Sequence, residues 1–152
     1  MHNNLGNVYK ELGELELAEE SFKKAIIINP DFLEANYSLC ITLHELGQLN
    51  DAVISYERVI SLKPDFSEAH SNLGVVLSEL GKLEDAEASF RKAIALDPNY
   101  SGSHYNLGNT LKDLKKIDES EASFRRAIEL EPDYAQAHNN LGNVIINPDR
   151  LT

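Results

Sequence analysis

The 152-residue sequence has a single cysteine, no tryptophan and no long hydrophobic run. Cys40 alone excludes an internal disulfide framework and suits a reducing compartment. The longest apolar runs, at 25–28 and 144–146, are far shorter than the ~20 residues that a transmembrane helix needs. Residues 1–20 lack the apolar stretch of a signal peptide. We therefore expect a cytoplasmic protein with no membrane partner.

Positive charge is also scarce. The chain has 14 Lys and Arg residues against 25 Asp and Glu residues, and its formal net charge is −11. A nucleic-acid partner requires a basic stripe, and an anionic membrane surface attracts basic segments. The composition therefore argues against both and favours basic or neutral proteins and peptides as partners.

The prominent positive feature is a 34-residue period. The triplet Asn-Leu-Gly occurs at 4–6, 72–74, 106–108 and 140–142, and Ser-Leu-Cys fills the gap at 38–40. The same interval separates four prolines, which are Pro30, Pro64, Pro98 and Pro132. It also separates four aromatic residues, which are Phe22, Tyr56, Phe90 and Phe124. A fixed period of this length indicates stacked units, none of which buries its apolar face alone.

Each unit has the pattern of two antiparallel helices, and no strand pattern competes. In residues 67–100, apolar residues recur at helical spacing up to Gly81, where a left-handed C-terminal cap is expected. A second helical pattern then runs to Asp97-Pro98, where proline ends it. We predict first helices at 2–12, 33–46, 67–80, 101–114 and 135–146, and second helices at 16–28, 50–62, 84–96 and 118–130.

These markers resemble the tetratricopeptide repeat. In the first unit the matching residues after Leu-Gly are Tyr9, Ala18, Phe22, Ala25 and Pro30. The Asn-Leu-Gly-Asn variant is similar to bacterial arrays and to the superhelical region of the O-linked N-acetylglucosamine transferases. The resemblance implies an all-α fold, a right-handed α-α superhelix of about four and a half repeats. It also implies a concave groove that binds proteins.

We expect one continuous solenoid over residues 1–152, divided into repeats 1–32, 33–66, 67–100 and 101–134 and a terminal helix 135–146. The favoured function is a non-enzymatic scaffold that binds an extended peptide in the groove. One alternative is a substrate-recruiting region of a larger enzyme such as a glycosyltransferase. Another is a structural solenoid that stacks head to tail through its ends.

An asparagine ladder is the main candidate for peptide binding. Asn is a mediocre residue inside a helix, and its carboxamide can pair with both polar groups of a passing peptide unit. Helix bridging within the repeat is the alternative role. The predicted groove residues are Asn4, Asn7, Tyr37, Ser38, Asn72, Tyr105, Asn106, Asn109, Asn140 and Asn143. The two tyrosines could equally anchor partner side chains or be ordinary surface residues.

A second row carries one acid per unit near the C-terminal end of each first helix, where the helix dipole disfavours negative charge. Selection of Lys- or Arg-bearing partners would explain it, and a solvated acidic edge explains it more simply. Its members are Glu11, Glu45, Glu79 and Asp113.

No cofactor, metal or catalytic site is predicted. Four histidines recur in register, at 2, 70, 104 and 138, but equivalent residues of neighbouring repeats lie about 8–10 Å apart, too far to share one ion. We expect them to pack or cap helices. Cys40 has no neighbouring histidine base and takes a packing position, so we predict no enzyme activity.

Departures from the repeat pattern concentrate in the second and fourth units. In the second, Cys40 replaces the packing glycine and Val59 replaces a small alanine. In the fourth, Lys115 replaces the turn glycine and Ser120 replaces the packing alanine. A side chain in a left-handed turn costs about 1 kcal/mol or more, so we expect the fourth unit to be the weakest.

Overall fold

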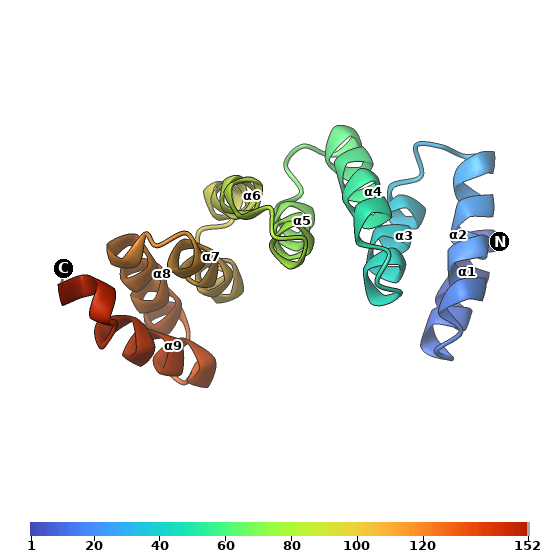
Figure 1. Ribbon diagram of the computed structural model, residues 1–152. Coiled ribbons are helices and arrows are strands. Elements are labelled where there is room, and N and C mark those ends of the chain that lie inside the picture. Colours follow the sequence, from blue (N-terminus) through green and yellow to red (C-terminus); the bar gives the residue numbers. More distant parts are fainter. Residues whose placement is uncertain (152) are drawn as a thin grey trace.

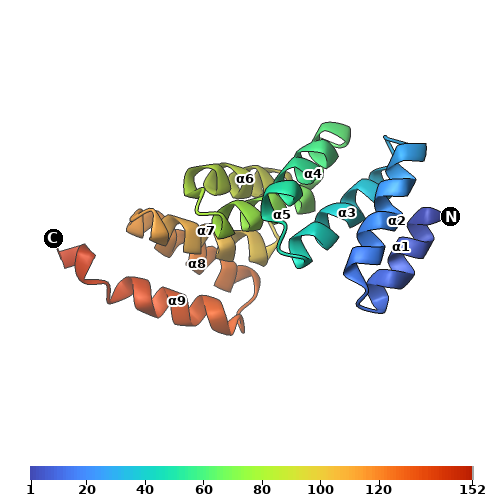
Figure 2. The ribbon, with the colours of Figure 1, turned by 45° about the vertical axis from the view of Figure 1, so that its right-hand side comes forward.

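The computed structural model describes residues 1–151, and all regular structure in that range is helical. Helices follow one another as antiparallel pairs along an elongated, curved array, with the two termini at opposite ends (Figure 1, Figure 2). The first helices of the pairs are α1 (His2–Glu11), α3 (Leu33–Glu45), α5 (Ser67–Glu79), α7 (Ser101–Asp113) and α9 (Ala135–Ile145). The second helices are α2 (Leu15–Ile28), α4 (Leu49–Leu62), α6 (Leu83–Leu96) and α8 (Ile117–Leu130).

A tight turn with one residue at positive φ ends the first helix of each complete pair. In three turns this residue is a glycine, namely Gly13, Gly47 and Gly81. In the fourth it is Lys115, with a φ of 64°. At Gly81 the N–H donates to the Ser78 carbonyl at 3.0 Å, and the next N–H, of Lys82, donates to the Leu77 carbonyl at 2.9 Å. This pair of bonds is the Schellman motif, so the predicted left-handed cap is confirmed.

Within a pair, a helical glycine of the first helix faces a buried aromatic ring of the second. A Cβ atom on Gly74 would lie 2.7 Å from the Phe90 ring, and one on Gly108 would lie 2.7 Å from Phe124. The second pair meets the same need with different residues. Cys40 replaces the glycine there, and both it and the opposing Tyr56 are buried. The small residue thus sets how closely the two helices approach.

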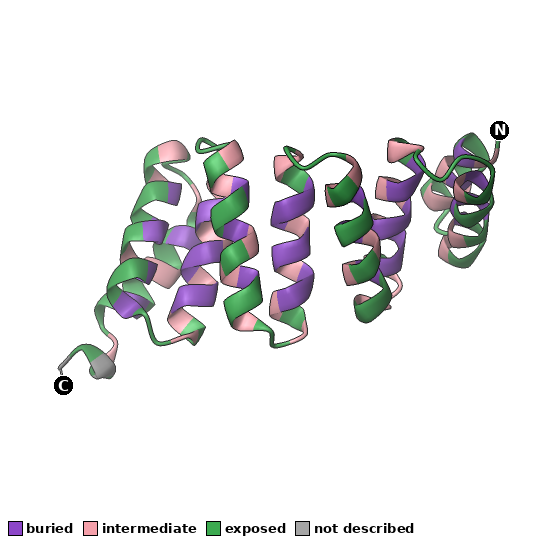
Figure 3. Ribbon diagram, turned by 90° about the horizontal axis from the view of Figure 1, so that it is seen from above, coloured by how far each residue is buried: buried purple, intermediate pink, exposed green. Residues whose placement is uncertain are grey.

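The core runs through the array between the helix layers, as the buried residues in Figure 3 show. Each second helix packs on the first helix of the next pair. In addition, α1 contacts α3, α5 contacts α7 and α7 contacts α9, whereas no two second helices of the described chain contact each other to the same extent. The first helices therefore lie on the shorter, inner side of the curve. We call the surface that the first helices expose on the inner side of the curve the inner face.

The predicted helix boundaries agree with the structure to within one residue. Each first helix ends one residue earlier than predicted, because the residue after it already belongs to the cap. Each second helix begins one residue earlier, at a leucine or isoleucine. The short 3₁₀ helix η1 (Pro148–Leu151) was not predicted. No helix within the described range is long and apolar enough to cross a membrane.

The two substitutions in the fourth unit behave differently. Lys115 has the strained positive φ that the sequence predicted. Ser120, in contrast, is fully buried and its hydroxyl donates to the Gly108 carbonyl at 2.7 Å. A buried hydroxyl that forms a hydrogen bond avoids the free-energy penalty of a buried hydroxyl without a partner. Of these two substitutions, only Lys115 therefore remains as a reason for weakness in this unit.

Candidate peptide-binding groove

The structure places the predicted ladder on successive first helices. Asn4 lies on α1, Ser38 on α3, Asn72 on α5, Asn106 on α7 and Asn140 on α9. Each occupies the same helical position, so the five side chains form one row along the inner face. Asn4 is exposed and the other four are half-buried.

Two rungs of the ladder are hydrogen-bonded inside the protein. The Asn72 Nδ2 atom donates to the Tyr37 hydroxyl at 3.0 Å, and the Asn140 Nδ2 atom donates to the Tyr105 hydroxyl at 3.2 Å. In both cases the partner lies 35 residues earlier, in the preceding repeat. Asn140 Nδ2 also donates to Asn109 Oδ1 at 2.8 Å, and the Asn140 side-chain oxygen has no hydrogen bond within residues 1–151. Bridging between repeats is therefore part of the role of these two asparagines.

The two tyrosines are wedged between aromatic rings rather than standing free. The Tyr37 ring lies 6.4 Å from Tyr56 and 4.7 Å from Phe66, between centroids. The Tyr105 ring lies 5.9 Å from Phe124 and 4.9 Å from Tyr134. Burial raises the pKa of Tyr37, and a hydrogen bond with Glu68 raises it further. Both rings are thus held in place by their aromatic neighbours.

The remaining ladder positions keep unused polar groups. Among the described residues, the side chains of Asn4 and Asn106 form no hydrogen bond, and the same holds for Ser38. Asn7 and Asn143, one turn further along α1 and α9, are likewise unpaired in this part of the chain. The inner face therefore offers amide groups at both ends and in the middle of the array.

In the acidic row, too, some side chains are paired inside the protein and others are not. The Glu45 carboxylate lies 3.5 Å from Lys10 Nζ, and the Glu79 carboxylate lies 3.0 Å from His44 Nε2. Both links again join residues 35 positions apart in neighbouring repeats. Within residues 1–151, Glu11 and Asp113 form no ion pair. Half of the row thus bridges repeats, which the sequence interpretation did not foresee.

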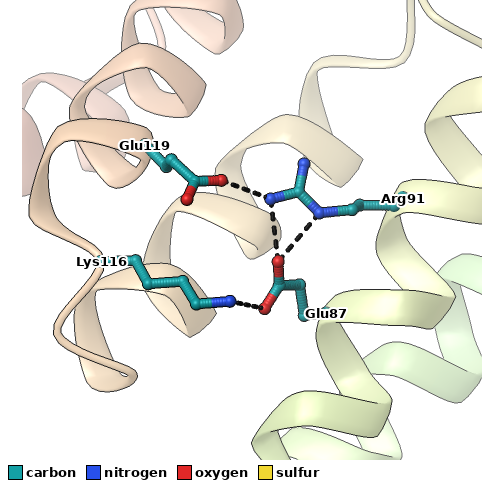
Figure 4. A network of polar contacts seen from close by, with 4 residues as sticks. All are labelled: Glu87, Arg91, Lys116 and Glu119. Carbon is teal, nitrogen blue, oxygen red and sulfur yellow. Dashed lines mark hydrogen bonds and ion pairs between the residues drawn. The ribbon is translucent and has the colours of Figure 1, made fainter.

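The second helices carry a separate charge network, shown in Figure 4. Glu87 of α6 accepts from Lys116 at 2.8 Å and pairs with Arg91, and Arg91 reaches Glu119 of α8 at 2.6 Å. The Lys116 hydrogen bond, with help from Arg91, lowers the pKa of the Glu87 carboxyl despite its burial. Arg150 of η1 repeats the pattern by pairing with Glu121. These ion pairs join neighbouring repeats on the second-helix side of the array.

Three of the four recurring histidines hydrogen-bond to the loops between repeats, in line with the expected capping role. His70, His104 and His138 each place Nε2 within 2.7–2.9 Å of the carbonyl of the proline six residues earlier. In the second repeat Asn36 takes this role, donating from Nδ2 to the Pro30 carbonyl at 3.1 Å. The described residues contain no cluster of side chains suited to a metal ion.

Cys40 is a packing residue. Its side chain is fully buried, and its thiol donates to the Asn36 carbonyl at 3.2 Å. Burial raises the pKa of the Cys40 thiol to about 12. The reactive thiolate form is therefore essentially absent near neutral pH.

Three family models match the chain. The first, described as "Tetratricopeptide repeat", covers residues 1–32 and 67–100. A second, described as "TPR repeat", covers 42–81 and 108–145, slightly more than half of the sequence. A third, again described as "Tetratricopeptide repeat", covers 89–122. The comparison with curated proteins finds no match.

Solved structures share the fold. MamA from Desulfovibrio magneticus RS-1 (residues 41 to the end) superposes with a TM-score of 0.93 at 22% identity, covering 97% of this chain and 84% of that one. YrrB, described as a TPR protein with an unusual peptide-binding site, gives 0.84 at 21% identity, with 99% and 79% covered. Pseudomonas aeruginosa PilF gives 0.84 at 21% identity, with 99% and 71% covered. Repeat register, helix pairing and family models agree, and the chain belongs to the tetratricopeptide repeat family.

Proposed function

We propose that this protein is a non-enzymatic interaction scaffold that binds an extended segment of a partner protein along its inner face. The observation that carries the proposal is the row of four asparagines and one serine on successive first helices, of which Asn4 and Asn106 have no side-chain partner inside the described chain. Polar side chains at regular intervals suit a ligand with a regular polar backbone. YrrB, which has the same fold, is described as peptide-binding.

The spacing of the rungs fits an extended peptide. Packed helices lie about 8–10 Å apart, and an extended chain advances about 3.3 Å per residue. Each repeat would therefore meet roughly every third peptide residue. Carboxamides that pair with backbone N–H and C=O groups recognise no particular side chain. Sequence preference must then come from the groups between the rungs.

Charge supplies one such preference. The chain carries a net charge of −11, and Glu11 and Asp113 on the inner face have no cationic partner among the described residues. Basic or neutral segments would approach this surface more readily than acidic ones, and added salt would weaken that preference.

The test uses the two unpaired rungs. The Asn4→Ala/Asn106→Ala variant should lose ~1–3 kcal/mol of binding free energy for a partner segment captured from source lysate, because peptide groups are left without partners. Its melting temperature should stay close to that of the parent, since neither side chain forms a hydrogen bond with the described residues. The control is Asn72→Ala, which breaks the bond to Tyr37 and should lower stability as well as binding. Unchanged affinity in the double variant would rule out the ladder.

End-to-end association is a second proposal, carried by apolar residues at the ends of the array. On α1, Leu5 and Val8 are 41% and 50% exposed, whereas their counterparts Leu73 and Val76 in the third repeat are 8% and 0% exposed. At the other end Ile145 and Ile146 are exposed. One end surface is presented by α1 and the other by α9. Because these two surfaces differ, a contact between them would be heterologous and would not have to form a closed ring.

A further inference from the structure

One aromatic position alternates along the inner face. Tyr37 of α3 and Tyr105 of α7 occupy the same place in the second and fourth repeats, and Ser71 of α5 occupies it in the third. In both tyrosine repeats the ring fills the space between the core aromatic of its own pair and the aromatic residue that precedes the next first helix. In the third repeat these flanking residues are Phe90 and Tyr100.

A hollow of about 480 Å³ lies at Ser71, the position of the tyrosine ring in the repeats on either side. Its lining includes Phe66, Asn72 and Tyr100, and the carboxylates of Glu68 and Asp97 belong to it too. The Ser71 hydroxyl is directed elsewhere, since it accepts a hydrogen bond from the Ser103 hydroxyl at 3.1 Å.

Tyr100, which lines the hollow, and Asn106, which lines a second hollow of about 170 Å³ together with Phe90, both lack the partner that their counterparts have. Phe66 and Tyr134 each pack on a tyrosine ring, at 4.7 and 4.9 Å, but Tyr100 packs on none in the described chain and is 53% exposed. Asn72 and Asn140 each donate to a tyrosine hydroxyl, but the Asn106 side chain makes no hydrogen bond within residues 1–151. The space and the stacking surface at Ser71, and the donor 35 residues later at Asn106, correspond by repeat register to one missing phenol.

We propose that this hollow between α5 and α7 binds a tyrosine side chain of the partner segment, with the ring against Tyr100 and the hydroxyl toward Asn106. The inference rests on the proposed function, since it names a side-chain preference within that groove. The internal pairs Tyr37–Asn72 and Tyr105–Asn140 are the template for the contact. Glu68 and Asp97 at the hollow repel a phosphate, so phosphotyrosine is excluded.

A filled-pocket variant can be designed from the protein's own repeats. Thirty-two residues after Tyr37 and Tyr105 stand Ala69 and Ala137, both fully buried, whereas Ser103 follows Ser71 at that interval. The double variant Ser71→Tyr/Ser103→Ala therefore reproduces the combination present in the neighbouring repeats. Ser103→Ala alone is the matched control, because it removes the same hydroxyl and leaves the hollow open.

The first measurement uses p-cresol as the probe and follows amide chemical shifts. Wild type and Ser103→Ala should show saturable shifts at Ser71, Asn72 and Tyr100. The double variant should lose them while keeping its helical signal. Absence of such shifts in the wild type would overturn the proposal, whatever the behaviour of the variants. Shifts that persist in the double variant would overturn it too, because the probe would then bind elsewhere.

The second measurement uses labelled nonapeptides of Ser, Gly and Lys with a central Tyr, Ala or phosphotyrosine. Wild type should bind the tyrosine peptide roughly tenfold more tightly than either other peptide, the scale of a stacked ring in a preformed site. The double variant should not discriminate. Equal binding of the Tyr and Ala peptides by wild type would overturn the pocket and leave the groove intact. If p-cresol binds at the hollow and no peptide binds at all, the groove proposal fails and the pocket stands.

Discussion

At the scale of single residues, small side chains and left-handed turns set the geometry of each pair. Gly74 and Gly142 have the same place in the repeat, but their surroundings differ. A Cβ atom on Gly74 would clash with the Phe90 ring, whereas one on Gly142 would meet nothing within 4 Å. The same residue type is therefore required by packing in one repeat and not in the other.

This difference predicts opposite effects of one substitution. Gly74→Ala should destabilise the protein by about 1–3 kcal/mol, because Phe90 is buried and cannot yield easily. Gly142→Ala should stabilise it by about 0.5–1 kcal/mol, because alanine restricts the unfolded chain and favours the helix. Chemical denaturation of the two variants measures both. A loss of stability in Gly142→Ala would show that its neighbourhood is more crowded than the structure indicates.

Lys115 is the strained residue of the fourth turn. Its φ of 64° belongs to the left-handed region, which side chains other than glycine adopt at a cost. Lys115→Gly should therefore raise the free energy of unfolding by up to about 1 kcal/mol. Gly81→Ala makes the reverse change at the equivalent turn position and serves as the control. It adds a side chain at a φ of 76°, where nothing crowds it. Lower stability in Lys115→Gly would mean that the lysine side chain contributes more than its backbone strain costs.

At the scale of helices, neighbouring repeats are joined on both sides. Bonds between residues 35 apart cross the inner face, as in Tyr37–Asn72, and bonds between residues 29 apart join the second-helix side, as in Glu87–Lys116. Between the first and second repeats both kinds occur, as Lys10–Glu45 on the inner face and Glu19–Gln48 on the second-helix side. That junction is therefore held on both sides.

The Glu87 network should make stability depend on pH. The pKa of the Glu87 carboxyl is lowered in the folded protein, chiefly by the Lys116 hydrogen bond. The contribution of this carboxyl to stability is therefore complete above the ordinary pKa of 4.5. The contribution is lost as pH falls from there through the lowered folded value. Glu87→Gln should thus be less stable than wild type near pH 7 and should converge with it in acid. Glu84→Gln, an exposed acid of the same helix, is the control. Parallel pH curves for wild type and Glu87→Gln would contradict this assignment.

Sequence reasoning found the helices because their ends are marked locally. Gly81 and Pro98 bracket one second helix by their own backbone chemistry, whatever the rest of the chain does. The Tyr37–Asn72 bond was not predicted, although both residues were named, because its formation depends on how one repeat is rotated on the next. A tyrosine and an asparagine 35 apart, found twice, is the signal that could have indicated it.

At the scale of the whole molecule, the array leaves apolar side chains at its two ends, including Val8 and Ile146. If these ends associate, the sedimentation coefficient should rise with protein concentration. The rise should be larger in high salt, which screens the repulsion between chains of net charge −11. Val8→Lys, which charges one end only, should abolish the effect. A concentration-independent monomer at high salt would rule out end-to-end association.

The inner face as the binding surface can be tested directly by mapping a captured partner segment onto the protein. Amide chemical shifts should change along α3, α5 and α7, with the largest changes around Asn72 and Asn106. Amides of the second helices, including those near Arg91 and Arg125, should stay unchanged. Changes confined to the second helices, with none around Asn106, would show that the partner binds the opposite side of the array.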